Sequence, residues 1–206
     1  MTIRDGSKGS NKLNTNKPGC LLGFALAWTA FSIVMAVLMF SGGETSIGAI
    51  LFISLFIIAG IGLMIYAGMI YYTRFKMGVP DFVLSRTEGK PGDQIDFSFT
   101  HTIRSDVSIN WMKAQLIFRE TATYQRGTDT TTVTYNNIMD EYEEPGFDFQ
   151  GGQMLSKAYT FVIPEDGMHT LKVRRNALEW FIKFEADIPS LPNFVEEFEI
   201  TVHPQF

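Results

Sequence analysis

The hydrophobic pattern opens with two long runs that contain no charged residue. The first run spans residues 20–40 and the second spans residues 47–72, with the short segment 41–46 between them. A helix needs about 20 consecutive apolar residues to cross the hydrocarbon core of a bilayer. Both runs meet that length, so the sequence predicts a hairpin of two transmembrane helices at 20–40 and 47–72.

The segments beside these runs differ from them in composition. Residues 1–19 are polar and carry several basic side chains, and residues 73–80 contain Arg74 and Lys76. A cleaved signal peptide has a shorter apolar stretch than residues 20–40 and a small-residue cleavage site, so the first run is not interpreted as a signal peptide. We therefore interpret residues 1–19 as a basic tail and residues 73–80 as a juxtamembrane linker.

From Asp81 onward the pattern alternates with a period of two. Ile95, Phe97 and Phe99 alternate with polar residues, and similar runs occur at 159–163, 178–186 and 198–202. Such alternation is typical of strands with one buried face. Turn residues separate seven or eight short strands, which predicts an immunoglobulin-like β-sandwich over residues 81–206. Between residues 107 and 118 the inward positions change phase, which predicts a β-bulge near Trp111.

Composition narrows the class of protein. The chain has 206 residues, of which 46% are hydrophobic and 19% charged, with one cysteine and three histidines. This composition excludes a disordered chain and a disulfide framework. Residues 1–80 have a net charge of +4 and residues 81–206 a net charge of −9. Because nucleic acid repels an acidic domain, nucleic-acid binding is not expected.

The basic residues also predict an orientation in the membrane. Arg4, Lys8, Lys12 and Lys17 precede the first run, whereas the connecting loop contains only the acidic Glu44. By the positive-inside rule, both termini and the β-domain are cytoplasmic. We therefore predict a multi-pass protein of the inner (cytoplasmic) membrane.

The final strands carry a resemblance to a known group of proteins. The segment YTFVIPEDGMHTLKVRRNALEWFIKFEADIPSLPNFVEEFEITV resembles the last strands of arrestin-like sandwiches. The segment KAQLIFRETATYQRG resembles the strand and charged hairpin of bacterial two-helix membrane proteins that have a cytoplasmic arrestin-like (immunoglobulin-like) β-sandwich domain. The resemblance covers roughly residues 95–203. It implies a protein-binding scaffold, and it supplies no catalytic residue.

The sequence shows no carrier for catalysis. His101, His169 and His203 lie far apart in the chain, and Cys20 lies at the start of an apolar run. No phosphate-binding loop or serine nucleophile motif is present. We expect no enzyme activity, no catalytic residue, no metal or other cofactor and no small-molecule substrate.

Two sets of residues are candidates for protein contacts. The first set consists of small or aromatic residues in the helices, where small side chains allow close approach: Gly23, Ala27, Trp28, Gly60, Gly62 and Ala67. Packing of the hairpin on itself explains this set as well as packing on a partner does. The second set is acidic and aromatic: Asp140, Glu141, Glu143, Glu144, Phe147 and Phe149. A solvated hairpin tip is the favoured interpretation of these acids, with a docking surface and a calcium site as alternatives.

These features favour a non-enzymatic accessory or scaffold subunit of a larger integral-membrane complex. The hairpin would pack on partner helices, and the acidic sandwich would support the cytoplasmic side. The alternative is a free-standing, membrane-tethered adaptor that recruits soluble proteins. A small channel of oligomerised hairpins is a weaker hypothesis, because neither helix contains an Asp, Glu, Lys, Arg or His side chain for an ion path.

Overall fold

A computed structural model describes residues 18–43, 46–78, 80–127 and 129–205. The basic tail residues before Pro18 and the loop residue Glu44 lie outside these ranges. The chain divides into a helical unit, residues 15–75, and a β unit that contains residues 76–206. Each unit is described separately below.

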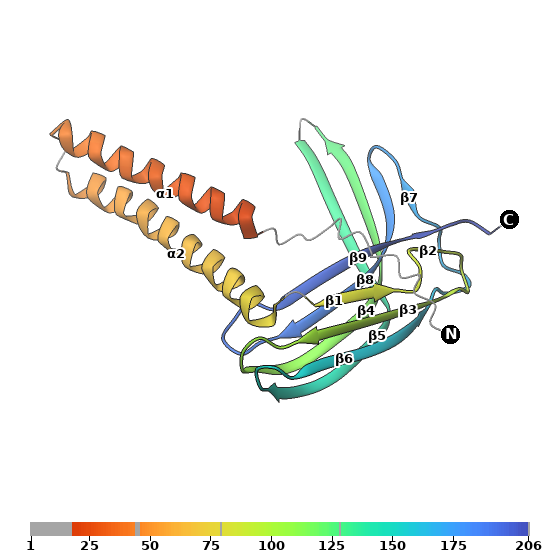
Figure 1. Cartoon of the computed structure of the whole chain (residues 1–206). Coiled ribbons are helices and arrows are strands. Elements are labelled where there is room, and N and C mark those ends of the chain that lie inside the picture. Colours follow the sequence, from red (N-terminus) through yellow and green to blue (C-terminus); the bar gives the residue numbers. More distant parts are fainter. Residues whose placement is uncertain (1–17, 44–45, 79, 128, 206) are drawn as a thin grey trace. The chain divides into compact units, whose positions relative to one another are not determined.

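The helical unit consists of two helices that lie side by side, α1 (Pro18–Ser41) and α2 (Ile47–Met77) (Figure 1). Gly43 after α1 adopts φ +84°, a conformation that glycine tolerates at a helix C-terminus. Ser46 caps α2, because its Oγ accepts a hydrogen bond from the Ala49 amide at 3.3 Å. Both helices are long and apolar enough to span a membrane. Helix α2 continues past the predicted end at Tyr72.

The β unit is a sandwich of two sheets. The smaller sheet has the order β1-β3-β6, and the larger has the order β2-β9-β8-β4-β5, with β7 paired to β8. The strands are β1 (Asp81–Leu84), β2 (Glu88–Gly89), β3 (Gln94–Thr102), β4 (Val107–Arg126), β5 (Asp129–Phe149), β6 (Met154–Val162), β7 (Leu171–Lys172), β8 (Asn176–Asp187) and β9 (Phe194–Val202). The predicted fold class, a helical hairpin followed by an all-β sandwich, is confirmed.

The inward-facing residues of the alternating strands form one core between the two sheets. Phe97, Phe161 and Phe184 are almost completely buried there. Phe82 of β1 contacts Phe184 and Phe198, with ring centroids 5.5 and 5.0 Å apart. Burial of such side chains is the main stabilising contribution to a sandwich. Met77, the last residue of α2, is 1% exposed and belongs to this core.

Strand β4 shows the predicted change of inward positions but not the predicted bulge. Ile109 and Met112 are both buried, which confirms the change of phase. The pairing of β4 with β5 keeps one register on both sides of Trp111. The register shifts instead between Leu116 and Ile117, where Met139 of β5 has no opposing residue. The bulge therefore lies in β5, and the prediction of a bulge near Trp111 was wrong. The alternation of residues in β4 gives no information about an extra residue in β5, the strand that pairs with it.

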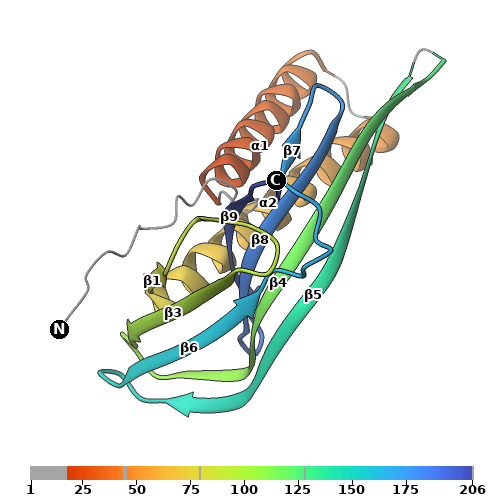
Figure 2. The same ribbon diagram turned by 90° about the vertical axis from the view of Figure 1, so that its right-hand side faces the viewer.

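Strands β4 and β5 are much longer than the other strands. Ala122 is the last residue of β4 that pairs with β8, while β4 and β5 pair as far as Arg126 and Asp129. Figure 2 shows the two strands extending together beyond the small sheet. The end of this hairpin is thus a two-stranded ribbon without a second layer.

Candidate interaction surfaces

A close contact between α1 and α2 is built around Gly60. A Cβ atom at this position would lie 2.3 Å from Thr29 Oγ1 and 3.1 Å from Trp28 Cδ1. Only a residue without a side chain permits that approach. The Trp28 ring stacks on Phe56 with centroids 5.2 Å apart and an interplanar angle of 4°. Its Nε1 donates a hydrogen bond to the Phe56 carbonyl oxygen at 3.1 Å, so the indole is satisfied within the hairpin.

Three hydroxyl side chains of the hairpin form hydrogen bonds within their own helices. Thr29 Oγ1 donates to the Ala25 carbonyl and Ser32 Oγ to the Trp28 carbonyl, both at 2.8 Å. Thr73 Oγ1 donates to the Met69 carbonyl at 3.0 Å. These bonds remove the cost of placing hydroxyl groups in an apolar environment. They leave the helices with an apolar outer surface.

The six candidate residues in the helices fall into two groups. Gly60 and Ala67 are buried and Trp28 is half-buried, whereas Gly23, Ala27 and Gly62 are exposed. A Cβ atom added at Gly23 or Gly62 would meet no atom within 4 Å. The first group is engaged in the hairpin, and the second group faces away from it.

Large apolar side chains cover the rest of the hairpin surface. Phe31 is 60% exposed, Leu55 64% and Ile58 65%. Soluble monomers rarely expose a continuous apolar surface of this kind. Such a surface is typical of helices that contact lipid or other helices.

The acidic candidate residues lie within strand β5, so the prediction of a hairpin tip was wrong. The β4–β5 turn follows Arg126, more than ten residues before Asp140. The Thr-rich segment between them forms strand rather than loop, because its side chains pair with Thr121 and Thr123 of β4. The acids consequently alternate between the two faces of the sheet.

Lysines from neighbouring strands pair with these acids on both faces. On the outer face Lys113 Nζ lies 3.0 Å from Glu143 Oε2 and 3.6 Å from Glu141 Oε1. The hydrogen bond to Glu143 raises the pKa of Lys113. On the inner face Lys157 Nζ lies 2.7 Å from Glu144 Oε2. The acidic segment is thus part of an ion-pair ladder. Among the described residues no group of three His, Cys, Asp or Glu side chains is placed to hold a metal ion.

The two aromatic candidates differ in their surroundings. Phe147 is 46% exposed, and Lys157 Nζ lies 6.0 Å from the centre of its ring. Phe149 is half-buried and packs against the core. Their ring centroids are 6.2 Å apart. Phe147 is therefore the more accessible of the two for a protein contact.

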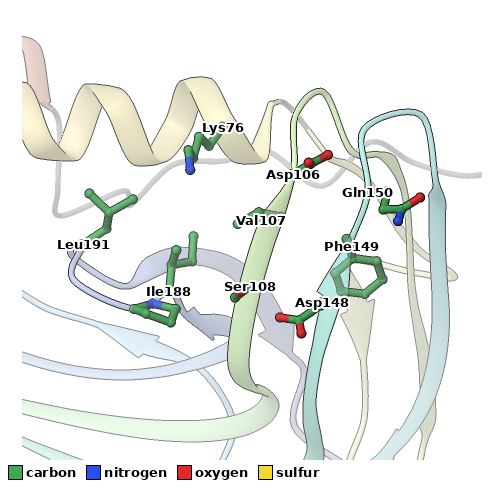
Figure 3. Close-up of a pocket in the computed structure, with 10 residues that line it drawn as sticks. Lys76, Asp106, Val107, Ser108, Asp148, Phe149, Gln150, Ile188 and Leu191 are labelled. Atoms are coloured by element: carbon green, nitrogen blue, oxygen red, sulfur yellow. The ribbon is translucent and has the colours of Figure 1, made fainter.

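A cavity of about 400 Å³ lies beside this segment (Figure 3). Its polar lining includes Lys76, Asp106 and Asp148, and its apolar lining includes Ile188 and Leu191. None of the histidines lines it. The lining is therefore mixed, and it includes Ser108, which lies opposite Asp148 in the pairing of β4 with β5.

An ion pair on the outer face of the large sheet was not identified from the sequence. Arg119 forms hydrogen bonds of 3.0 and 3.2 Å from Nη2 and one of 3.2 Å from Nη1 to the carboxylate of Glu197. Its guanidinium also lies 4.3 Å from the centre of the Phe181 ring. The sequence signal for this ion pair was Phe181, a bulky apolar residue at an outward position of β8. The alternation of apolar and polar residues predicts a polar residue at that position.

Comparisons with known proteins identify no family. No protein-family profile matches the sequence, and no curated protein matches it. Among solved structures the chain is similar to Spo0M, a sporulation control protein from Bacillus subtilis, with 15% sequence identity and a TM-score of 0.49. The match covers 61% of this chain and 49% of Spo0M, so it spans about half of that protein's length.

Proposed function

We propose that this chain is a non-enzymatic, membrane-anchored scaffold subunit of a larger integral-membrane complex. The observation that carries the proposal is the helical hairpin: its seam at Gly60 is closed, while the outward faces of both helices are apolar and exposed. A closed hairpin with an apolar exterior can enter a membrane without a further polar contact. Its exterior is then free to pack against other helices.

The exposed small residues supply the contact for a partner helix. Gly23 and Ala27 lie four residues apart on α1, so they occupy the same face of the helix. Small residues at that spacing let another helix approach closely. Gly60 and Ala67 have no such role, because they are buried in the hairpin itself. The helix partner therefore meets α1 at Gly23 and Ala27.

The β unit acts on the cytoplasmic side of the inner membrane in this proposal. Arg74 and Lys76 follow the apolar part of α2, and the positive-inside rule assigns such residues to the cytoplasm. The net charge of −9 keeps the sandwich away from anionic lipid headgroups. The sandwich can then support or recruit another protein of the complex.

Purification of the full chain under native expression in a mild detergent tests the proposal. We expect an integral-membrane partner to copurify in a fixed ratio, measured by mass spectrometry. Replacement of both Gly23 and Ala27 by leucine is expected to reduce recovery of the partner at least tenfold. The matched control is Val34→Leu, an apolar exchange at another exposed position of α1. Unchanged recovery with the double variant would disprove the helix contact.

A second candidate function is a free-standing adaptor that recruits soluble proteins. It is favoured by the exposed Phe147 beside the cavity lined by Asp106 and Asp148. Exchange of residues 18–73 for an unrelated two-helix anchor separates the two functions. An adaptor retains its soluble partners after this exchange, whereas a subunit of a membrane complex loses its partner.

A further inference from the structure

Strand β5 forms one edge of the large sheet. It pairs with β4 on one side, and it stands last in the order of that sheet. Part of its other side lies near β6, where Tyr142 Oη donates a hydrogen bond to the Thr160 carbonyl at 2.8 Å. Lys157 of β6 also pairs with Glu144. Within the part of the chain that the structure describes, these contacts with β6 involve the second half of β5.

The two halves of β5 differ in chemistry, and the bulge at Met139 separates them. The second half, residues 140–149, contains five acids and Pro145. Charges, proline and bulges are the usual devices that prevent a sheet edge from pairing with another chain. The first half, Thr130–Ile138, contains no charged residue, no proline and no glycine. It is an edge without these devices.

The unprotected half also exposes apolar side chains on both faces of the large sheet. Val133 is 50% exposed and Tyr135 63%, and both share a face with Tyr124 of β4, which is 49% exposed. Ile138, on the opposite face, is 52% exposed. The small sheet ends before this point (Figure 2). An added strand would therefore cover apolar area as well as backbone groups.

We propose that two copies of this chain associate by antiparallel pairing of their Thr130–Ile138 segments. The acids of residues 140–148 select the direction, and the self-complementary register around Thr134 favours a second copy as the occupant. Parallel pairing in register would place the acids of residues 140–148 opposite each other, which is destabilising. Antiparallel pairing around Thr134 places the two acidic halves at opposite ends and brings only neutral residues together. It also sets Val133 across from Tyr135 of the partner subunit, a favourable aromatic and β-branched pair.

The pairing joins two large sheets into one continuous sheet. Every backbone group along the shared segment that faces the edge gains a partner, as in strand addition generally. This association goes beyond the scaffold function proposed above, because it does not depend on the helices or on any other protein.

The full chain in detergent micelles is the material for the test, and its mass is measured by native mass spectrometry after detergent removal in the gas phase. We expect the wild-type protein to be a dimer. Thr134→Lys and Thr134→Glu each place like charges across the two-fold axis, so each alone is expected to weaken dimerisation at least tenfold. An equimolar mixture of the two variants is expected to restore a dimer that contains one copy of each.

The control is Thr123→Lys, which adds the same charge on the same face but one strand away from the edge. It is expected to remain dimeric. A second measurement uses a single cysteine at Thr134 with Cys20 replaced by serine, which should form a disulfide between copies on mild oxidation. A cysteine at Met154, 70% exposed in β6, should not. A monomeric wild-type protein, or a Thr134→Lys variant that stays dimeric and a position 134 that does not cross-link, would overturn the proposal.

Discussion

The seam of the helical hairpin makes a quantitative prediction for the substitution Gly60→Ala. The new Cβ atom would lie 2.3 Å from Thr29 Oγ1, whereas ordinary contacts of a Cβ lie at 3.4–4 Å. Either Thr29 must rotate and lose its hydrogen bond to Ala25, or the helices must separate. Loss of the hydrogen bond costs about 1 kcal/mol. Overpacking of a close contact costs about 1–3 kcal/mol.

We take about 2 kcal/mol as the change in the free energy of hairpin opening, which corresponds to about a 30-fold larger opening equilibrium constant. The assay uses Ser32→Cys, a nearly isosteric exchange at a position that is 1% exposed, with Cys20 replaced by serine. A small thiol reagent reacts with this cysteine only when the hairpin opens, so the labelling rate reports the opening equilibrium. We expect Gly60→Ala to raise that rate about 30-fold in detergent micelles.

Gly62→Ala is the matched control, because its Cβ atom would meet nothing within 4 Å. Both substitutions bring the same gain in helix propensity, of about 1 kcal/mol, so the difference between them isolates the clash. The control should change the labelling rate less than twofold. Adding Thr29→Ala to Gly60→Ala removes Oγ1 and should restore most of the slow labelling. Equal rates for Gly60→Ala and Gly62→Ala would refute the close contact.

Two further predictions concern the β unit. Arg119→Met leaves the carboxylate of Glu197, only 8% exposed, without its ion pair. Unfolding of the β unit in urea, followed by tryptophan fluorescence, should show a loss of about 3 kcal/mol. The same exchange at an exposed pair, Arg86→Met, should cost less than about 1 kcal/mol. Equal losses would contradict the role of burial. Burial, with a smaller contribution from Glu144, raises the pKa of Tyr159 to about 12. The folded state therefore holds this proton more tightly, so stability is retained below pH 10 and falls as the pH rises toward 12. In the same urea assay Tyr159→Phe should lose less stability over that interval than the wild type, and identical pH profiles would contradict this.

Much of the fold could be predicted from the sequence because each element carries a strong period. An uncharged run longer than 20 residues has few alternatives to a membrane-length helix. Ile95, Phe97 and Phe99 alternate with polar residues, and all three are buried as predicted. The length of α2 is a different matter, because Met77 is helical yet buried in the core of the β unit, a contact that periodicity does not encode.

The candidate surfaces were less predictable because they depend on pairings between distant strands. The acids of β5 looked like a free tip, since the sequence does not show that Lys113 and Lys157 lie beside them. Similarly, Gly60 and Gly62 have similar apolar neighbours in the sequence, so the sequence does not distinguish them. In the structure Gly60 packs against Thr29, whereas Gly62 is exposed. Ion pairs and close contacts between residues that are distant in the sequence produce no local sequence pattern from which they could be predicted.

Other ion pairs of the large sheet, like those of the acidic segment in β5, affect how the net charge of the β unit acts in recognition. Lys172 contacts both Glu179 and Glu199, and their hydrogen bonds outweigh the opposing effect of burial and raise the pKa of this lysine. Carboxylates committed to such pairs are poorly available to a basic partner, because a new ion pair would have to replace an existing one. The net charge then acts mainly at a distance, by excluding anionic surfaces. This agrees with the proposals made above, in which specific contacts use the uncharged outer faces of the helices and the edge at Thr130–Ile138.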